Sequence, residues 1–96
     1  MVVDPDGVEL TTIRELVDLD GLRLLEVGCG DGRLTFGCAE RAASVLAFDA
    51  DEELVREARR QTPSALRDRI RFQVADAAEI DLPPAEFDLA LFSWSL

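Results

Sequence analysis

Short apolar segments alternate with segments of helical pattern, and this alternation restricts the fold more than any other feature of the chain. The expected strands cover residues 22–27, 44–49, 70–76 and 87–94, and the expected helices cover residues 8–19, 33–41 and 52–61. Strands that alternate with helices pair in parallel, because each helix carries the chain back to the same edge of the sheet. Right-handed crossovers then predict a doubly wound parallel α/β sheet, with elements in the order α-β-α-β-α-β-β and strand order 3-2-1-4.

Three glycines, Gly28, Gly30 and Gly32, follow the first of these strands, and Glu26 stands two residues before them. Glycine at such a turn permits a positive φ and lets a ligand approach the backbone without meeting a Cβ. The next helix begins here, and its free N–H groups suit a carboxylate or a phosphate. The dinucleotide turn G-x-G-x-x-G is not matched, because Arg33 stands where its last glycine belongs. The glycines alone are equally compatible with an ordinary tight turn.

Two acidic residues close the next two strands. Asp49 ends the second strand and Asp76 ends the third. Ligands of parallel sheets bind at the carboxyl ends of the strands, where these carboxylates can accept hydrogen bonds from ribose hydroxyls and an adenine amino group. The simpler interpretations are that Asp49 only precedes a helix that Asp51 caps, that Asp76 is a loop acid, and that Glu26 is solvated.

Taken together, E-x-G-x-G-x-G, the two strand-ending acids and "FDLALFSWSL" resemble the class I S-adenosylmethionine-dependent methyltransferases over about residues 16–96. The resemblance implies a Rossmann-like fold and S-adenosyl-L-methionine as cofactor. It implies that the turn from Gly28 to Gly32 wraps the methionine part of the cofactor. The other roles that it implies are Glu26 at the amino group, Asp49 on the ribose, Ala50 against the adenine, Asp76 and Ala77 at the adenine edge, and Ser93 beside the methyl group. With the glycines, Cys29 of the same turn completes the predicted cofactor site.

Composition narrows the chemistry further. The net charge is −10, and the chain has no lysine, histidine or tyrosine. An acidic surface disfavours nucleic acid and anionic membranes as partners of this segment, and only Asp and Glu remain as ordinary general bases. Cys29 and Cys38 lack the spacing and the histidine of a zinc site, so we expect reduced structural thiols and no metal. The acidic N-terminus lacks the basic region of a signal peptide, and no apolar run is long enough to cross a bilayer, so we expect a cytoplasmic location. Methyl transfer by in-line displacement depends largely on orientation, and the sequence identifies no catalytic residue.

The sequence also predicts a single cofactor-binding domain over residues 1–96, incomplete at its C-terminus. The family's sheet usually has seven strands, whereas this chain supplies four, so it resembles a truncated class I methyltransferase fold. The fourth strand is apolar with a bare edge, which predicts a covering partner or a second copy of the chain. This strand lacks the N-P-P-Y-like turn of the family members that methylate amino groups of DNA bases or some protein glutamines, so the resemblance favours a small-molecule acceptor. Two alternatives stay open: a non-catalytic cofactor-binding or interaction module, and a nicotinamide-binding half-domain.

Overall fold

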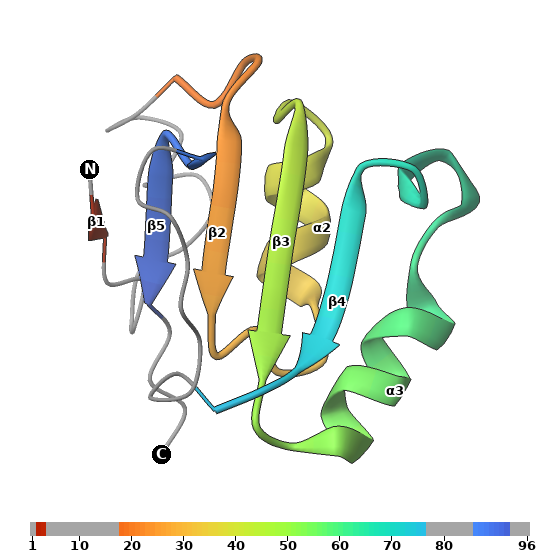
Figure 1. Ribbon diagram of the computed structural model, residues 1–96. Helices are drawn as coiled ribbons and strands as arrows, with labels where there is room; N and C mark the ends of the chain where they lie inside the picture. The colour runs from red at the N-terminus through yellow and green to blue at the C-terminus, as the bar shows by residue number, and fades with distance from the viewer. Residues whose placement is uncertain (1, 4–17, 77–85, 93–96) are drawn as a thin grey trace.

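The computed structural model describes residues 2–3, 18–76 and 86–92 and shows a parallel sheet with helices on one side (Figure 1). The strands are β1 (Val2–Val3), β2 (Arg23–Val27), β3 (Ser44–Asp49), β4 (Ile70–Val74) and β5 (Leu89–Phe92). The helices are α2 (Arg33–Ala39) and α3 (Glu52–Gln61), followed by the short 3-10 helix η1 (Ser64–Leu66). The expected α/β class is therefore confirmed.

The strand order is β1-β5-β2-β3-β4, and every neighbouring pair is parallel. Without β1 this is the predicted order 3-2-1-4, which is confirmed. Register aligns the carboxyl ends of the strands: Val27 pairs with Phe48 on one side and with Phe92 on the other. One residue further along, Asp49 pairs with Val74. The residues that follow β2, β3 and β4 therefore emerge side by side at one edge of the sheet.

Local sequence signals explain most element boundaries. The bounds of β3 and α3 are those predicted, and the Asp51 carboxylate caps α3 by accepting the N–H groups of Glu53 and Leu54 at 3.0 and 3.3 Å. β2, β4 and α2 are shorter than predicted, and β5 begins at Leu89, two residues later than predicted. The predicted end of that strand, at residues 93 and 94, lies outside the described residues. At the start of β5, the Asp88 carboxylate instead accepts the backbone N–H of Arg23 at 2.8 Å and fixes the entry into the strand. Of the helix predicted over residues 8–19, only Asp18 and Leu19 lie among the described residues, and neither is helical.

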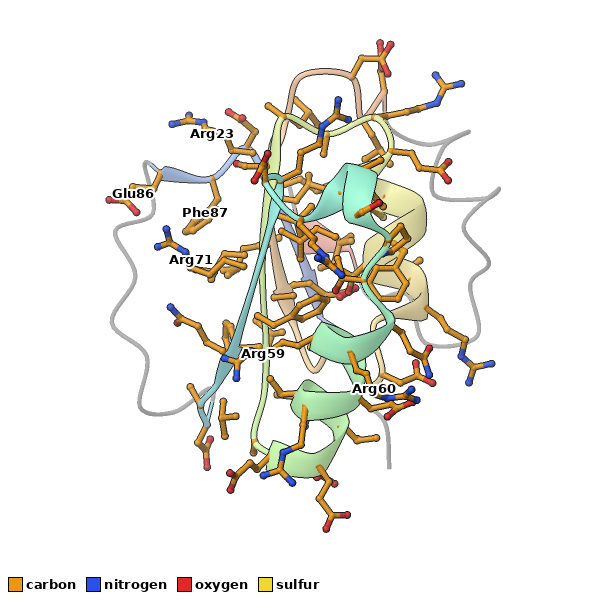
Figure 2. The ribbon with its side chains drawn as sticks, turned by 90° about the vertical axis from the view of Figure 1, so that its right-hand side faces the viewer. Arg23, Arg59, Arg60, Arg71, Glu86 and Phe87 are labelled. Carbon is orange, nitrogen blue, oxygen red and sulfur yellow. The ribbon has the colours of Figure 1, made fainter. Side chains whose placement is uncertain are left out.

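Both faces of the sheet carry apolar clusters. Figure 2 shows α2 and α3 on the same side of the sheet, where Leu24, Ala47, Val55 and Phe72 belong to the larger buried cluster. The opposite face has a smaller cluster centred on Leu25, Val27 and Phe48. Because side chains alternate along a strand, Glu26 shares the helix-covered face with Leu24. An acidic residue therefore lies inside the core, which makes Glu26 the most unusual residue of β2.

The two edges of the sheet differ from expectation. The edge of β5, predicted to be bare, is paired at Ala90 and Leu91 with the chain's own Val2 and Val3. That prediction was wrong for these two residues, because β1 lies far away in sequence and has no recognisable strand pattern. The opposite edge is β4, where the Arg59 guanidinium donates to the outward-facing Phe72 carbonyl at 2.7 Å. This contact occupies a backbone acceptor that another strand would otherwise use.

None of the helices in the described part of the chain is long and apolar enough to cross a bilayer.

Candidate functional site

The glycine turn leaves β2 at the carboxyl edge of the sheet and is tied to the end of β3. Gly28, Gly30 and Gly32 have φ values of 81°, 58° and 88°, so all three occupy the left-handed region that only glycine enters without strain. The backbone N–H groups of Gly28 and Cys29 both donate to the Phe48 carbonyl, at 2.8 and 3.1 Å. The positive φ predicted for this turn is confirmed at each glycine.

The second and third glycines have different surroundings. A Cβ at Gly32 would lie 3.0 Å from Cζ of Phe36 and 3.2 Å from both the Ala58 Cβ and Cζ of Phe72. A Cβ at Gly30 would meet nothing within 4 Å. Gly32 therefore allows α2 and α3 to pack closely over the sheet, whereas Gly30 borders open space. Only Gly30 of this pair lies where a ligand can approach the backbone.

We expect Gly32→Ala to lower the free energy of unfolding by about 2–4 kcal/mol, combining left-handed strain with overpacking of the two phenylalanines. The matched control is Gly21→Ala, because Gly21 also has a positive φ, 75°, but no atom within 4 Å of the added Cβ. That control retains only the conformational strain, about 1 kcal/mol. Urea unfolding of both variants measures the difference, and equal losses would contradict a packing role for Gly32.

Asp49, the last residue of β3, stabilises the glycine turn through a hydrogen bond. Its Oδ2 accepts the backbone N–H of Gly30 at 3.0 Å, and its Oδ1 accepts the backbone N–H of Asp51 at 2.9 Å. Asp49 is half-buried, and each carboxylate oxygen has a second lone pair for a ligand. Asp49 is thus more than an acid preceding a helix, because Asp51 caps α3 while Asp49 positions Gly30. Ala50, next in the chain, is exposed at the same edge.

Glu26 is buried beneath the turn, with only 1% of its surface exposed. The Thr35 hydroxyl of α2 donates to its Oε1. Burial raises the pKa of Glu26 to about 7; the Thr35 hydrogen bond opposes the shift, and the nearby charge of Asp49 adds to it. The interpretation of Glu26 as a solvated strand-end residue is therefore wrong. A carboxyl group with a pKa near neutrality changes its charge readily when a cation binds beside it.

The thiol of Cys29 lies in the turn and stays protonated. Burial raises its pKa to about 12, and repulsion from Glu26 and Asp49 contributes to the shift. Cys38, in α2, is also buried, and neither cysteine forms a disulfide. Because the thiolate is the nucleophilic form, Cys29 is unsuited to covalent chemistry and serves as part of the wall of the turn.

The remaining predicted residues are only partly covered by the structure. Asp76 is exposed, two residues beyond Val74, the partner of Asp49 in the sheet. Ala77 and Ser93 lie outside the described residues. The N–H groups at the start of α2 are less available than expected: that of Gly32 donates to the Cys29 carbonyl at 3.1 Å, and that of Arg33 to the Asp31 carboxylate at 3.4 Å. These two N–H groups are therefore not free for an anion.

Two residues near the site escaped the sequence analysis. Thr35, the hydrogen-bond donor to Glu26, is fully buried, and it shares a helix face with Cys38 and Ala39. A hydroxyl on the apolar face of α2 was the available signal, because a buried hydroxyl needs a partner. Val74 is exposed to 44% beside Asp49. It provides an apolar surface next to the Asp49 carboxylate. The alternation of side chains along the predicted strand could have placed it there.

Comparison with known proteins gives a consistent result. A family model described as a methyltransferase domain matches residues 24–96. The magnesium-protoporphyrin O-methyltransferase of Rhodobacter capsulatus is 36% identical over 76 residues, 79% of this chain and 34% of that protein. A probable ribosomal RNA small subunit methyltransferase A of Methanospirillum hungatei is 32% identical over 85 residues, 88% of this chain and 33% of that protein. The chain thus spans about a third of the length of these relatives.

A solved structure extends the similarity to three dimensions. The S-adenosylmethionine-dependent methyltransferase from Mesorhizobium loti superposes with a TM-score of 0.76 and 29% sequence identity. The alignment covers 93% of this chain and 41% of that one.

Proposed function

Since this chain belongs to the class I S-adenosylmethionine-dependent methyltransferases through its match over residues 24–96, we propose that its glycine turn binds S-adenosyl-L-methionine. We further propose that the protein transfers the cofactor's methyl group to a small organic acceptor. The observation that carries the proposal is the Asp49 carboxylate, which holds Gly30 at 3.0 Å at the carboxyl edge of the sheet. This contact joins the turn after β2 to the end of β3, as a ligand spanning both strands requires.

The charge of the site favours this cofactor over a phosphate-bearing one. Glu26 and Asp49 lie close enough for each to raise the pKa of the Cys29 thiol, and Asp31 is a third acidic residue that does so. The sulfonium and ammonium groups of S-adenosylmethionine are cations, which such a site attracts, whereas the phosphates of NAD are repelled. The electrostatics therefore disfavour the nicotinamide-binding alternative.

In this proposal each residue has one task. The methionine part of the cofactor lies against the open side of Gly30. Glu26, buried beneath the turn, balances the charge of the cofactor's ammonium group directly or through water. The Asp49 carboxylate accepts hydrogen bonds from the ribose hydroxyls with its remaining lone pairs, and Ala50 lies against the adenine. Asp76, Ala77 and Ser93 keep the roles that the resemblance implies for the adenine edge and the methyl group.

The chemistry proposed for the protein is direct methyl transfer. The bound cofactor would supply an electrophilic methyl carbon. An acceptor atom would attack it in line with its bond to sulfur, and the new bond would form as that bond breaks, leaving sulfur as a neutral thioether. The positive charge would pass to the acceptor, which would lose it by releasing a proton to water where the acceptor atom carries one. Catalysis then depends on holding the two reactants in line, which requires no histidine or lysine. The Cys29 thiol, kept neutral by its pKa of about 12, does not compete as a methyl acceptor.

Calorimetric titration with S-adenosylmethionine, and separately with NAD, tests the cofactor. We expect saturable binding of S-adenosylmethionine only. Gly30→Ala should weaken this binding about tenfold or more, because its Cβ enters the space left for the ligand. Gly21→Ala carries comparable backbone strain at the far end of β2 and should bind normally. Preferential binding of NAD, or equal affinities of the two variants, would contradict the proposal.

The acceptor class needs a separate experiment, because one relative is named for a porphyrin and another for ribosomal RNA. The net charge of −10 favours a small molecule over RNA. The full-length protein is incubated with a cell extract and cofactor labelled in its methyl group, and the products are separated by size. Label in the small-molecule fraction supports the proposal, and label in RNA overturns the acceptor class. Bound cofactor without any transfer would establish the non-catalytic binding module instead.

A further inference from the structure

A second hollow lies at the opposite edge of the sheet from the glycine turn. Its volume is about 560 Å³, and it opens over the amino ends of β2, β3 and β4, between Arg23, Leu46, Arg71 and Phe87. Figure 2 shows Arg23, Arg71 and Phe87 on the side of the sheet away from α2 and α3. We call this hollow the amino-edge groove. Its distance from the carboxyl edge, by the full length of the strands, separates it from the cofactor site.

The charge of the amino-edge groove is opposite to that of the rest of the protein. Of the ten arginines in a chain of net charge −10, four line it: Arg23, Arg67, Arg69 and Arg71. Asp68 and Glu86 are the acidic residues of its lining, and Asp88 pairs with Arg23, so four arginines face three carboxylates and positive charge is in slight excess. On an acidic surface, such a local excess of guanidinium groups is a focus for anions.

Two of the four arginines are already engaged. Arg23 pairs with the Asp88 carboxylate at 3.2 Å, and Arg69 donates to the Ala39 and Glu40 carbonyls at 3.2 Å each. The guanidinium groups of Arg67 and Arg71, by contrast, make no hydrogen bond or ion pair with any residue that the structure describes. Arg67 and Arg71 also border a second hollow of about 310 Å³, beside Arg59. They therefore form a ridge at the start of β4 with donors available to a ligand.

The floor of the amino-edge groove is apolar. Leu46 and Phe87 are both half-buried and pack against the smaller apolar cluster, on the face of the sheet away from the helices. The volume falls within the roughly 300–1,000 Å³ of small-molecule sites. An apolar floor beneath a guanidinium rim matches an amphiphilic anion, with a ring or acyl body below and a charged group above.

We propose that the amino-edge groove binds a small organic anion whose carboxylate or phosphate pairs with Arg67 and Arg71 and whose apolar body rests on Leu46 and Phe87. S-adenosylmethionine itself is a poor occupant, because its sulfonium and ammonium cations are repelled by the rim. The proposal does not depend on the function proposed for the carboxyl edge.

Calorimetric titration of the full-length protein with benzoate and with phenyl phosphate tests the site and distinguishes the two anionic groups. Benzyl alcohol has the same ring without the charge, and inorganic phosphate has a charge without the ring. We expect saturable binding of benzoate or phenyl phosphate that is at least tenfold tighter than that of either control. Arg67→Gln and Arg71→Gln should each weaken it about tenfold, because each removes a charge-assisted hydrogen bond.

The matched control is Arg56→Gln, an exposed arginine of α3 that pairs with Glu52 and lies outside both hollows. It should leave anion binding unchanged. Unaltered thermal melts will show that the Arg67 and Arg71 variants are folded, as expected for side chains that make no hydrogen bond or ion pair with a described residue. Equal affinities in all three variants, or equal binding of benzyl alcohol, would overturn the proposal. It would also be overturned if the two arginine variants lost affinity for an RNA oligonucleotide while benzoate and phenyl phosphate failed to bind.

Discussion

Asp49→Ala is expected to weaken binding of S-adenosylmethionine by about 100-fold or more. The substitution removes the carboxylate proposed for the ribose hydroxyls, and it also releases the Gly30 N–H that the carboxylate holds at 3.0 Å. Hydrogen bonds to a charged group contribute about 1.5–3 kcal/mol each, so the loss of two accounts for the expected factor. Calorimetric titration at constant pH measures the change.

The control for this prediction is Asp51→Ala, two residues further along. Asp51 caps α3 through the N–H groups of Glu53 and Leu54, so its loss should lower stability by about 1 kcal/mol and leave cofactor binding intact. Asp49→Asn preserves the shape of the side chain and isolates its charge. If Asp49→Ala bound the cofactor as tightly as Asp51→Ala, Asp49 would have no part in the site.

Local patterns were sufficient to predict the centre of the fold. Val45, Ala47 and Phe48 are buried as an interior strand requires, and Asp51 followed by Glu52 and Glu53 marks the start of α3. Such signals lie within a few residues of the element that they define. The parallel order then followed from the alternation of strands and helices, because few topologies satisfy it.

Features that depend on distant contacts could not be predicted in the same way. The pairing of β1 with β5 joins Val2 to Ala90, across nearly the whole chain. The close approach of Phe36, Ala58 and Phe72 to Gly32 likewise depends on three separate elements. A glycine-rich motif predicts a turn, but it does not indicate which glycine serves packing and which borders open space.

The burial of Glu26 shows the same limit in the site. Its position in the motif predicted a role at the cofactor's amino group, but alternation alone did not show that α2 would cover that face of β2. Once α2 packs there, the carboxyl group leaves water and gains the Thr35 hydroxyl as its partner. The raised pKa is a consequence of that packing, and two measurable effects of pH follow from it.

The first effect is on stability. Folding raises the pKa of Glu26 from 4.5 to about 7, so the folded state binds this proton more tightly than the unfolded state. Stability therefore falls as pH rises from about 4.5 to 7, because ionisation is easier in the unfolded chain. Glu26→Gln removes this penalty. The free energy of unfolding of the variant, compared with that of the wild type, should therefore increase by up to about 3 kcal/mol as the pH rises from 4 to 8. Urea unfolding across this range measures it, and a constant difference would contradict the burial of an ionisable group.

The second effect of pH is on cofactor binding, and we expect its free energy to be comparable with that of the effect on stability. The ammonium group of S-adenosylmethionine favours the ionised carboxylate, so binding below pH 7 must release the Glu26 proton. The dissociation constant should rise about tenfold for each pH unit below the pKa of Glu26, which is about 7, and level off above it. Titrations from pH 5 to pH 7.5 stay below the pKa of the cofactor's own α-amino group, about 7.7–8.0. Glu26→Gln should bind more weakly at pH 7.5 and lose the slope, whereas Glu53→Gln, an exposed acid of α3, should retain it. A wild-type affinity independent of pH would separate Glu26 from the cofactor and leave its buried charge a property of the fold alone.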